Sequence, residues 1–451
     1  MKKVYLAAIA GNIGMLSVGQ FFGWASPTLP KLIQDKDAEY PVHLTFDEAS
    51  WIAALLTLGT TFGSIICALV VNTLGRKNTM LFAAVPSIIG WLIIIFATSP
   101  WMLYLSRIIS GLALGIAYTV TPMYLGEISP PKIRGNLISM LTVAVNMGIV
   151  IEYTIGPFLS VKTLALVSLV SPCLFIAVFL WVPESPYYLM LRNDKKRTIK
   201  SLVQLRGKED VYKEADRIEE SIKADFVKNS GFRELLFVPS NCRALRIKVC
   251  LSIFQQMSGI HAILQYAETI FNKANTNLED KYLTMILGTV QLICTIVCMF
   301  ITDRCGRKLL LIISSIGSAC STAMVATYFT LQCYDVDTSV LEWLPAIGIF
   351  MYIIMYSVGL APLPSTISGE IYPMNVKALG IMLSLSVANI TAFLITKLYA
   401  VFADNIGTYV SFWIFTASSF LASLYIFFYV PETKGKTLEQ IQEKLNKLPK
   451  K

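Results

Sequence analysis

Twelve long apolar segments constrain what this chain can fold into more than any other feature of its sequence. Each has close to the ~20 residues that an α-helix needs to cross the hydrocarbon core of a bilayer. Inside that core every backbone polar group must be paired within the structure, and a helix does this by itself. The sequence therefore predicts an all-α membrane protein with twelve transmembrane helices. They are expected at residues 4–26, 50–71, 80–97, 101–123, 137–158, 165–183, 247–272, 284–303, 309–331, 343–368, 379–402 and 408–430.

The composition excludes an ordinary soluble protein and the spacing of the segments suggests two halves. Charged residues are 15% of the 451 residues, against roughly 25% in an average soluble domain. The expected domains are two six-helix bundles at residues 1–183 and 247–431, a cytoplasmic linker at 184–246 and a cytoplasmic tail at 432–451. Apolar residues recur at helical spacing in Tyr212–Phe226, so the linker is expected to contain short helices.

The distribution of charge predicts the orientation of the chain in the membrane. The formal net charge is +9, from 38 Lys and Arg against 29 Asp and Glu. With a cytoplasmic N-terminus, 31 of the 38 basic residues fall on the cytoplasmic side, fifteen of them between Arg192 and Lys248. The first outer loop is instead acidic. This asymmetry is typical of membrane topology, so we expect both termini to be cytoplasmic and no binding to nucleic acid.

Three short motifs recur in the same order in both halves, each after the equivalent helix. They are Asn72–Lys77 with Asp303–Lys308, Gly126–Pro130 with Gly369–Pro373, and Pro183–Ser185 with Pro431–Thr433. A repeat of six helices is typical of secondary transporters, in which the substrate path lies at the interface of the repeats near the middle of the membrane.

Further motifs lie in register with these helices and point to a family. They are Gly75–Lys77, Arg107 with Gly111 and Gly115, Pro122–Pro130 leading to Arg134, Pro183–Pro186, Gln255–Gly259, Asp303 with Gly306–Lys308, and Pro431–Leu438. Over nearly the whole chain they resemble the sugar porters of the major facilitator superfamily, and among those the insect facilitated trehalose transporters. The resemblance implies two pseudo-symmetric six-helix bundles and facilitated transport of a sugar, trehalose or a hexose, by alternating access.

A few features bear on whether transport is coupled to protons, on the competing functions and on the membrane in which the protein lies. Proton-coupled sugar porters carry an Asp where this chain has Ala25, which favours uniport; Glu152 is the remaining candidate for a proton site and keeps symport open. A non-transporting sugar sensor is disfavoured by the short tail. Two His residues without metal spacing, and no nucleotide-binding loop, predict no enzyme activity, metal or cofactor. We expect a monomer in the lipid bilayer of the plasma membrane.

The charged residues of the repeated motifs are candidates for a cytoplasmic gate. Arginines are expected to face glutamates at the inner ends of the helices and to separate when the inner side opens. The residues are Arg76, Glu127, Arg134, Glu184, Asp303, Arg307, Glu370 and Glu432. Asn72 stands where the family usually has Asp, so we expect the network to be weaker in the first half. The alternative is that these charges only anchor the helix ends at the headgroups.

Neutral polar residues within the apolar segments are the candidates for sugar binding. Amides both donate and accept hydrogen bonds, as sugar hydroxyls do, and polar groups in a membrane core are costly unless they line a wet path. The candidates are Gln20, Tyr153, Gln255, Gln256, His261, Gln265, Tyr266, Gln291 and Asn389. His261 replaces the usual Asn of the family and Ser365 the usual Trp. Hydrogen bonding between helices is the alternative role for each candidate.

Overall fold

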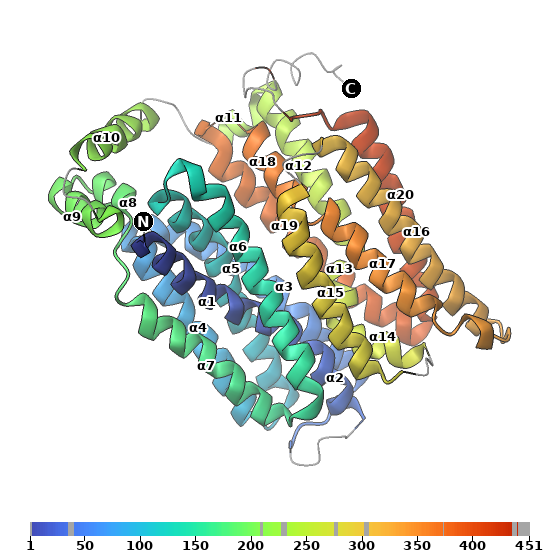
Figure 1. Cartoon of the computed structure of the whole chain (residues 1–451). Coiled ribbons are helices and arrows are strands. Elements are labelled where there is room, and N and C mark those ends of the chain that lie inside the picture. Colours follow the sequence, from blue (N-terminus) through green and yellow to red (C-terminus); the bar gives the residue numbers. More distant parts are fainter. Residues whose placement is uncertain are drawn as a thin grey trace. The chain divides into compact units, whose positions relative to one another are not determined.

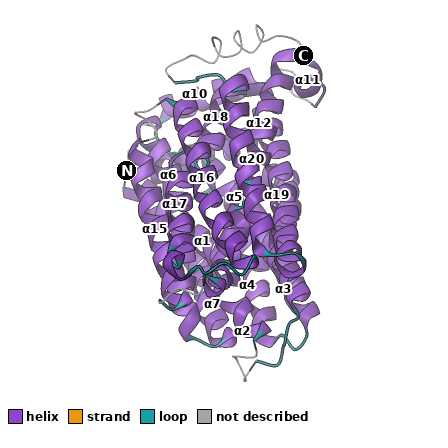
Figure 2. Cartoon of the chain, turned by 90° about the vertical axis from the view of Figure 1, so that its right-hand side faces the viewer, coloured by secondary structure: helices purple, strands orange, loops and turns teal. Residues whose placement is uncertain are grey.

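The structure, a computed structural model, describes residues 2–34, 40–207, 211–226, 232–274, 278–301, 306–372, 374–434 and 440. These residues form helices joined by loops, and Figure 2 shows no strand among them. Twelve helical spans are long and apolar enough to cross a membrane. The prediction of an all-α membrane protein is thus confirmed.

The helices of the first half are close to those expected. They are α1 (Lys2–Gly23), α2 (Ala25–Ile33), α3 (Phe46–Leu74), α4 (Arg76–Phe96), α5 (Pro100–Ile128), α6 (Pro131–Ile155) and α7 (Val161–Phe179). A 3₁₀ turn, Gly156–Phe158, follows α6. Short helices α8 (Pro186–Leu191), α9 (Lys195–Arg206), α10 (Tyr212–Phe226) and α11 (Phe232–Phe237) come next.

The second half contains two interrupted spans. Its helices are α12 (Pro239–Met257), α13 (Ile260–Gln265), α14 (Ala267–Lys273), α15 (Asp280–Ile301), α16 (Arg307–Cys333), α17 (Leu344–Val358), α18 (Leu363–Ile371), α19 (Met374–Asn405) and α20 (Thr408–Tyr429). A 3₁₀ turn, Ser339–Leu341, precedes α17. Since α12 begins at Pro239, it takes in the last residues of the stretch that the sequence assigned to the linker.

The chain forms two compact units whose bounds differ from the sequence division. Unit 1 comprises Met1–Trp24, Asp37–His43 and Leu55–Asn229, and unit 2 comprises Ala25–Lys36, Leu44–Ala54 and Ser230–Lys451. Within unit 1, Figure 1 shows α8 and α9 beside the N-terminal end of α1, and α10 packs against α8 and α9. Buried Met190, Leu202 and Ile222 give these three short helices an apolar core of their own. The helix α3 begins in unit 2 and continues in unit 1 after Ala54.

Glycines allow α3 and α5 to approach closely within unit 1. A Cβ atom on Gly59 would lie 2.5 Å from the carbonyl oxygen of Ile108, and one on Gly111 would lie 2.7 Å from Gly59 Cα. The glycines four residues later on each helix, Gly63 and Gly115, also face backbone atoms of the other helix. Two small residues four apart on each helix are a common packing device in membranes, where close van der Waals contact replaces the hydrophobic effect.

Three spans that the sequence treats as continuous helices are interrupted. The first is divided at Trp24, between α1 and α2. The seventh is divided at Ser258 and Gly259, where Gly259 has a φ of +92° that favours glycine, and the tenth is divided between Gly359 and Pro362. The spans expected at 247–272 and 343–368 are present, but the prediction that each is one continuous helix was wrong. The length of an apolar segment can be read from the sequence. The pairing of backbone groups that makes a break in its helix tolerable cannot.

We predict that Gly111→Ala lowers the melting temperature of the purified protein by several degrees, because the added methyl group must push backbone against backbone at a cost of about 1–3 kcal/mol. Gly126→Ala is the matched control, since a Cβ atom there meets nothing within 4 Å. Fluorescence-detected unfolding in detergent measures both. Equal melting temperatures for the two variants would contradict the close approach of α3 and α5.

Candidate functional site

The first copy of the repeated charged motifs forms a tight ion pair within unit 1. Arg76 Nε lies 3.0 Å from both carboxylate oxygens of Glu127, and Nη2 lies 3.0 Å from Oε1. The two side chains are only 5% and 14% exposed. Asn72 Oδ1 accepts a further bond from Arg76 at 3.2 Å, and the Ser185 hydroxyl donates to Glu127. A guanidinium bound by more than one contact to a poorly hydrated carboxylate is a strong and directional pair.

A second carboxylate caps the helix that begins at Arg76. Glu184 accepts the backbone N–H of Lys77 at 3.0 and 3.2 Å, and the N–H of Ser185 at 2.7 Å. The first N–H groups of a helix have no partner within the helix and carry a partial positive charge, so a carboxylate stabilises them. Gly75, with a φ of +93°, is required here because a Cβ atom would collide with Glu184. Lys77 Nζ donates to the Leu180 carbonyl at 2.7 Å.

Unit 2 repeats the same cap at the start of α16. Glu432 accepts the backbone N–H groups of Arg307 and Lys308, both at 3.1 Å, and that of Lys434 at 3.0 Å. Lys308 Nζ donates to the Phe427 carbonyl at 2.7 Å, as Lys77 does to Leu180. Burial raises the pKa of Glu432, but the backbone hydrogen bonds from Lys434, Lys308 and Arg307 outweigh it and hold the pKa below its usual value.

The two ion pairs differ in a way that the sequence did not predict. Arg307 Nη2 lies 3.4 Å from Glu370 Oε1, and these side chains are 13% and 27% exposed. The first-half pair is therefore shorter and more buried, although Asn72 was expected to weaken it. Asn72 accepts a hydrogen bond from Arg76 through its amide oxygen, so this contact does not need the charge of an Asp. Asp303 lies outside the described residues.

Arg134 is placed differently from the other predicted gate residues. It is an exposed residue in the first turn of α6 and is in no ion pair with a described residue. Its backbone N–H donates to the Pro130 carbonyl at 3.2 Å. The structure thus shows no glutamate facing Arg134 among the described residues, and Arg76 and Ser185 bind the carboxylate of Glu127; a gating role for Arg134 stays a prediction.

The break in the tenth span is held by one of the predicted sugar ligands. Gln255 Nε2 donates to the Leu360 carbonyl at 2.8 Å, and it lies 3.4 Å from the Ala361 carbonyl and 3.3 Å from the Tyr356 hydroxyl. The break leaves these carbonyls without a helical partner, and the amide supplies one. Gln256, the next residue, has a buried side-chain oxygen with no hydrogen-bond partner among the described residues.

Further unpaired polar atoms lie on the interrupted seventh span of unit 2 and on α19, which packs against α12 and α13. Neither amide atom of Gln265, which is buried, has a partner among the described residues, and the same holds for the Tyr266 hydroxyl and for Asn389 Nδ2. The Tyr266 ring packs against Tyr399 of α19 at 5.1 Å between centroids. Leaving such groups unpaired costs about 1–3 kcal/mol each, so a protein interior that holds several of them is suited to bind a polar molecule.

The remaining candidates of unit 2 are less informative. His261 is partly buried and comes two residues after the turn at Gly259, and Gln291 is a partly buried residue of α15. Ser365, in place of the family's usual Trp, is exposed on α18 and donates to the Pro362 carbonyl at 2.7 Å. Its side chain is thus engaged with its own helix.

Two polar side chains in the spans of unit 1 are hydrogen-bonded to serines of α7. Gln20 Oε1 accepts the Ser171 hydroxyl at 2.5 Å, and buried Glu152 accepts the Ser168 hydroxyl at 2.5 Å. Tyr153, next to Glu152 on α6, is fully buried.

Arg107 is a buried charge in the same part of unit 1. Its Nη1 donates to the Phe21 carbonyl at 2.9 Å and its guanidinium lies 4.2 Å from the Trp24 ring centroid, at the break between α1 and α2. It also interacts electrostatically with Glu152. Arg107 and Glu152, both buried within the spans of unit 1, thus offset each other.

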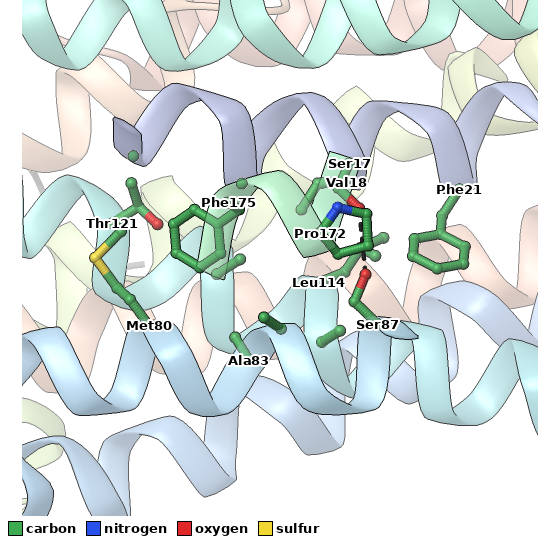
Figure 3. Close-up of a pocket in the computed structure, with 15 residues that line it drawn as sticks. Ser17, Val18, Phe21, Met80, Ala83, Ser87, Leu114, Thr121, Pro172 and Phe175 are labelled. Atoms are coloured by element: carbon green, nitrogen blue, oxygen red, sulfur yellow. Dashed lines mark hydrogen bonds between the residues drawn. The ribbon is translucent and has the colours of Figure 1, made fainter. Parts of the chain in front are cut away.

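A cavity inside unit 1 is too small to be the sugar site. It has a volume of about 30 Å³ and lies between α1, α4, α5 and α7. Figure 3 shows Phe175, Met80 and Thr121 around one part of it and the hydrogen bond between Ser17 and Ser87, 3.2 Å long, in another. That volume holds a water molecule or two, whereas pockets for organic ligands are about 300–1,000 Å³.

Sequence reasoning missed several residues that complete these arrangements. Ser185 donates to Glu127, and Tyr356 lies beside Gln255. The Thr396 hydroxyl is buried without a partner among the described residues. Thr396 comes seven residues, or two turns, after Asn389, so helical spacing from a known candidate was a signal that could have found it.

Twelve spans among the described residues, charged motifs repeated in both halves, and interrupted helices define the class of this protein as a secondary transporter of the major facilitator type. A profile of the family described as "Sugar (and other) transporter" matches residues 14–445, and the chain belongs to that family. The resemblance predicted from the sequence motifs is thus confirmed.

Individual relatives agree with this assignment. The chain is 34% identical over 442 residues to a facilitated trehalose transporter Tret1 of Polypedilum vanderplanki, covering 98% of this chain and 87% of the relative. A Tret1 of Apis mellifera ligustica is 33% identical, with 97% and 87% covered. The fold is similar to the partially occluded, inward-open xylose transporter XylE from E. coli, with a TM-score of 0.80, 22% identity, and 97% and 100% covered.

We predict that Arg76→Gln and Glu127→Gln each lower the uptake rate about tenfold at unchanged surface expression, a loss equivalent to about 1.4 kcal/mol. The double variant should be no slower than either single one, because both changes remove the same contact. Initial rates of sugar uptake in cells measure the effect, with surface biotinylation as the expression check. Arg134→Gln is the control and should stay near the parent rate. Strictly additive losses, or an equal loss for Arg134→Gln, would refute the pairing.

Proposed function

We propose that this protein is a uniporter for a neutral sugar, trehalose or a hexose, that works by alternating access. It acts as a monomer in the plasma membrane with both termini in the cytoplasm and performs no catalysis. Membership of the sugar transporter family supports the transport of a sugar, and the names of the insect relatives favour trehalose. The excess of basic residues in the predicted cytoplasmic loops supports the orientation.

The observation that carries the proposal is the set of unpaired, buried amides and hydroxyls beside the interrupted seventh span. Gln256, Gln265 and Tyr266 lie on either side of the turn at Gly259 or shortly after it, and Asn389 lies on α19. Interrupted helices are a common site of substrate binding in transporters, because the break exposes polar groups to a wet path. Neutral donors and acceptors match the hydroxyls of a sugar.

The charges of unit 1 favour an uncharged cargo. Arg107 is engaged with the Phe21 carbonyl, Trp24 and Glu152, and Glu152 with Ser168. A cation that is already matched by a carboxylate is poorly suited to bind an anionic substrate.

Proton symport through Glu152 is the second candidate function. This carboxylate is fully buried on a membrane-spanning helix of unit 1. Ionisable side chains inside membrane-spanning helices are the groups that carry protons in transporters. A measurement of sugar uptake must therefore distinguish uniport, driven by the sugar gradient alone, from symport, driven also by the proton gradient.

The inner-end residues act, in this proposal, by making each repeat rigid. The ion pair of Arg76 with Glu127 and the cap by Glu184 connect helices of unit 1, and the pairings of Arg307 and Glu432 connect helices of unit 2. Rigid repeats move as bodies, as alternating access requires.

We predict saturable uptake of radiolabelled trehalose or a hexose when the chain is expressed in cells without sugar uptake of their own. Uptake should stop at equal concentrations on both sides and be unchanged by a protonophore, because uniport uses no second gradient. Accumulation against the gradient that collapses with the protonophore, and that is lost in Glu152→Gln, would favour symport instead. No uptake of trehalose, glucose or fructose by a protein at the cell surface would overturn the proposal.

We predict opposite phenotypes for two neighbouring glutamines. Gln256→Leu removes an amide whose buried oxygen has no partner among the described residues, so it should raise KM about three- to tenfold, equivalent to the loss of one hydrogen bond of about 0.5–1.5 kcal/mol, with little change in melting temperature. Gln255→Leu removes the donor to the Leu360 carbonyl and should lower the melting temperature and expression. Uptake kinetics and thermal unfolding of both variants test this; a fall in stability for Gln256→Leu with unchanged KM would assign it a packing role.

A further inference from the structure

A lysine of α19 binds the first two turns of α3 through three different groups. Lys397 Nζ lies 2.6 Å from Asp47 Oδ1 and 2.5 Å from Ser50 Oγ, and it lies 4.3 Å from the centroid of the Trp51 ring. The lysine side chain is 16% exposed, against 70% for that of Asp47. A cation held by a carboxylate, a hydroxyl and an aromatic face is confined to one position, unlike the lysine of an ordinary surface ion pair.

The two helix faces match each other beyond this lysine. Asp47, Ser50 and Trp51 are spaced three and four residues apart, so they share one face of α3. Phe393 precedes Lys397 by four residues on α19 and packs against Trp51, with 6.2 Å between the ring centroids. Asp47 also lies in the first turn of α3, where a negative charge is favourable.

Two other contacts tie the same early segments to the helices that follow the break in the seventh span. The Ser26 hydroxyl of α2 accepts the backbone N–H of Glu268 at 3.1 Å, in a buried position. Lys273 Nζ lies 5.9 Å from the centroid of the Phe46 ring. Ala25–Lys36 and Leu44–Ala54 accordingly belong to unit 2, although they come from the first sequence repeat.

These contacts differ in kind from those of the repeated charged motifs. Arg76 and Glu127 both come from the first repeat, and Arg307 and Glu370 both from the second, so these pairs can persist in every state of a transporter. Asp47 comes from the first repeat and Lys397 from the second. If the repeats move apart on one side of the membrane, this pairing is among those that must break.

We propose that Asp47, Trp51 and Lys397 form a clamp that holds the outer end of the transport path closed and is released when the path opens outward. The inference rests on the proposed transport function and on the predicted outer location of this end of the chain. Lys397 is a positioning residue in this account: it touches no substrate, and its three contacts exist only while the first turns of α3 lie against α19. The clamp therefore sets the balance between the states that are closed and open on the outer side.

Hydrogen–deuterium exchange of the full-length protein without sugar tests the clamp. In Lys397→Gln and in Asp47→Asn, protection at residues 45–55 and 390–400 should fall by about fivefold or more, the scale of a modest conformational coupling. Protection around residues 72–78 and 306–311, at the far end of the helices, should rise at the same time. A local loss of packing would not produce that remote gain.

Three further variants make the test decisive. The charge exchange Asp47→Lys with Lys397→Asp regains the ion pair but not the contact of a cation with the Trp51 ring, so it should restore part of the parent pattern of protection at both ends. Lys281→Gln is the control, because it breaks an ion pair with Glu279, only two residues away in the chain. It should leave protection around residues 72–78 and 306–311 unchanged. Lys397→Arg keeps the cation and should stay close to the parent. Changes confined to residues 45–55 and 390–400, or no restoration by the exchange, would overturn the clamp.

Uptake separates the clamp from the proposed function. If the parent protein carries a sugar, Lys397→Gln should lower the half-saturating concentration measured from outside and raise the one measured from inside, because the outward-open state becomes more populated. If the parent carries no sugar, the proposed function fails, while the exchange measurement still supports or overturns the clamp. Equal half-saturation on both sides in parent and variant would count against it.

Discussion

The hydrogen bonds between the Gln255 amide and the carbonyls of the tenth span allow unit 2 to hold two interrupted helices side by side. A break in a membrane helix leaves carbonyl groups that lipid cannot pair, and each costs several kcal/mol if it stays open. Gln255 Nε2 donates to the Leu360 carbonyl at 2.8 Å, and the Ser314 hydroxyl accepts the N–H of Leu360 at 2.9 Å. The seventh span is fastened in the same way, since Ser418 donates to the Met257 carbonyl at 2.7 Å.

Gln255, Ser314 and Ser418 pair the backbone groups at the breaks. Other polar side chains nearby are therefore not needed for this pairing. Gln256, Gln265 and Tyr266 follow Gln255 along the same interrupted span and hold buried polar atoms that no described residue pairs. The Gln255 amide thus pairs backbone carbonyls at the break. The unpaired polar atoms of the neighbouring residues remain available to hydrogen-bond a polar substrate. The repeated motifs show another shared device, since Glu184 and Glu432 cap equivalent helices of the two halves.

Much of this fold could be predicted from residue types alone, because the length of an apolar segment is set by the thickness of the bilayer. The twelve spans, the repeated motifs and the family followed from the sequence. The breaks at Trp24, Gly259 and Gly359 did not, since a hydropathy pattern carries no information about which backbone groups are paired. For the same reason the sequence could not separate Gln255 from Gln256. It also could not show that Arg134 is exposed or that Lys397 meets Asp47, because both depend on contacts between segments far apart in the chain.

Counterflow in proteoliposomes tests the central claim, facilitated sugar transport, most directly. Vesicles that contain the purified protein are loaded with a high concentration of unlabelled trehalose or glucose and diluted into a trace of the labelled sugar, without any ion gradient. Facilitated transport predicts a transient accumulation of label inside the vesicles, because the carrier brings labelled sugar in while unlabelled sugar leaving the vesicle occupies its inner site. Label that never exceeds its external concentration, for every sugar tested and with protein shown to be folded, would contradict it.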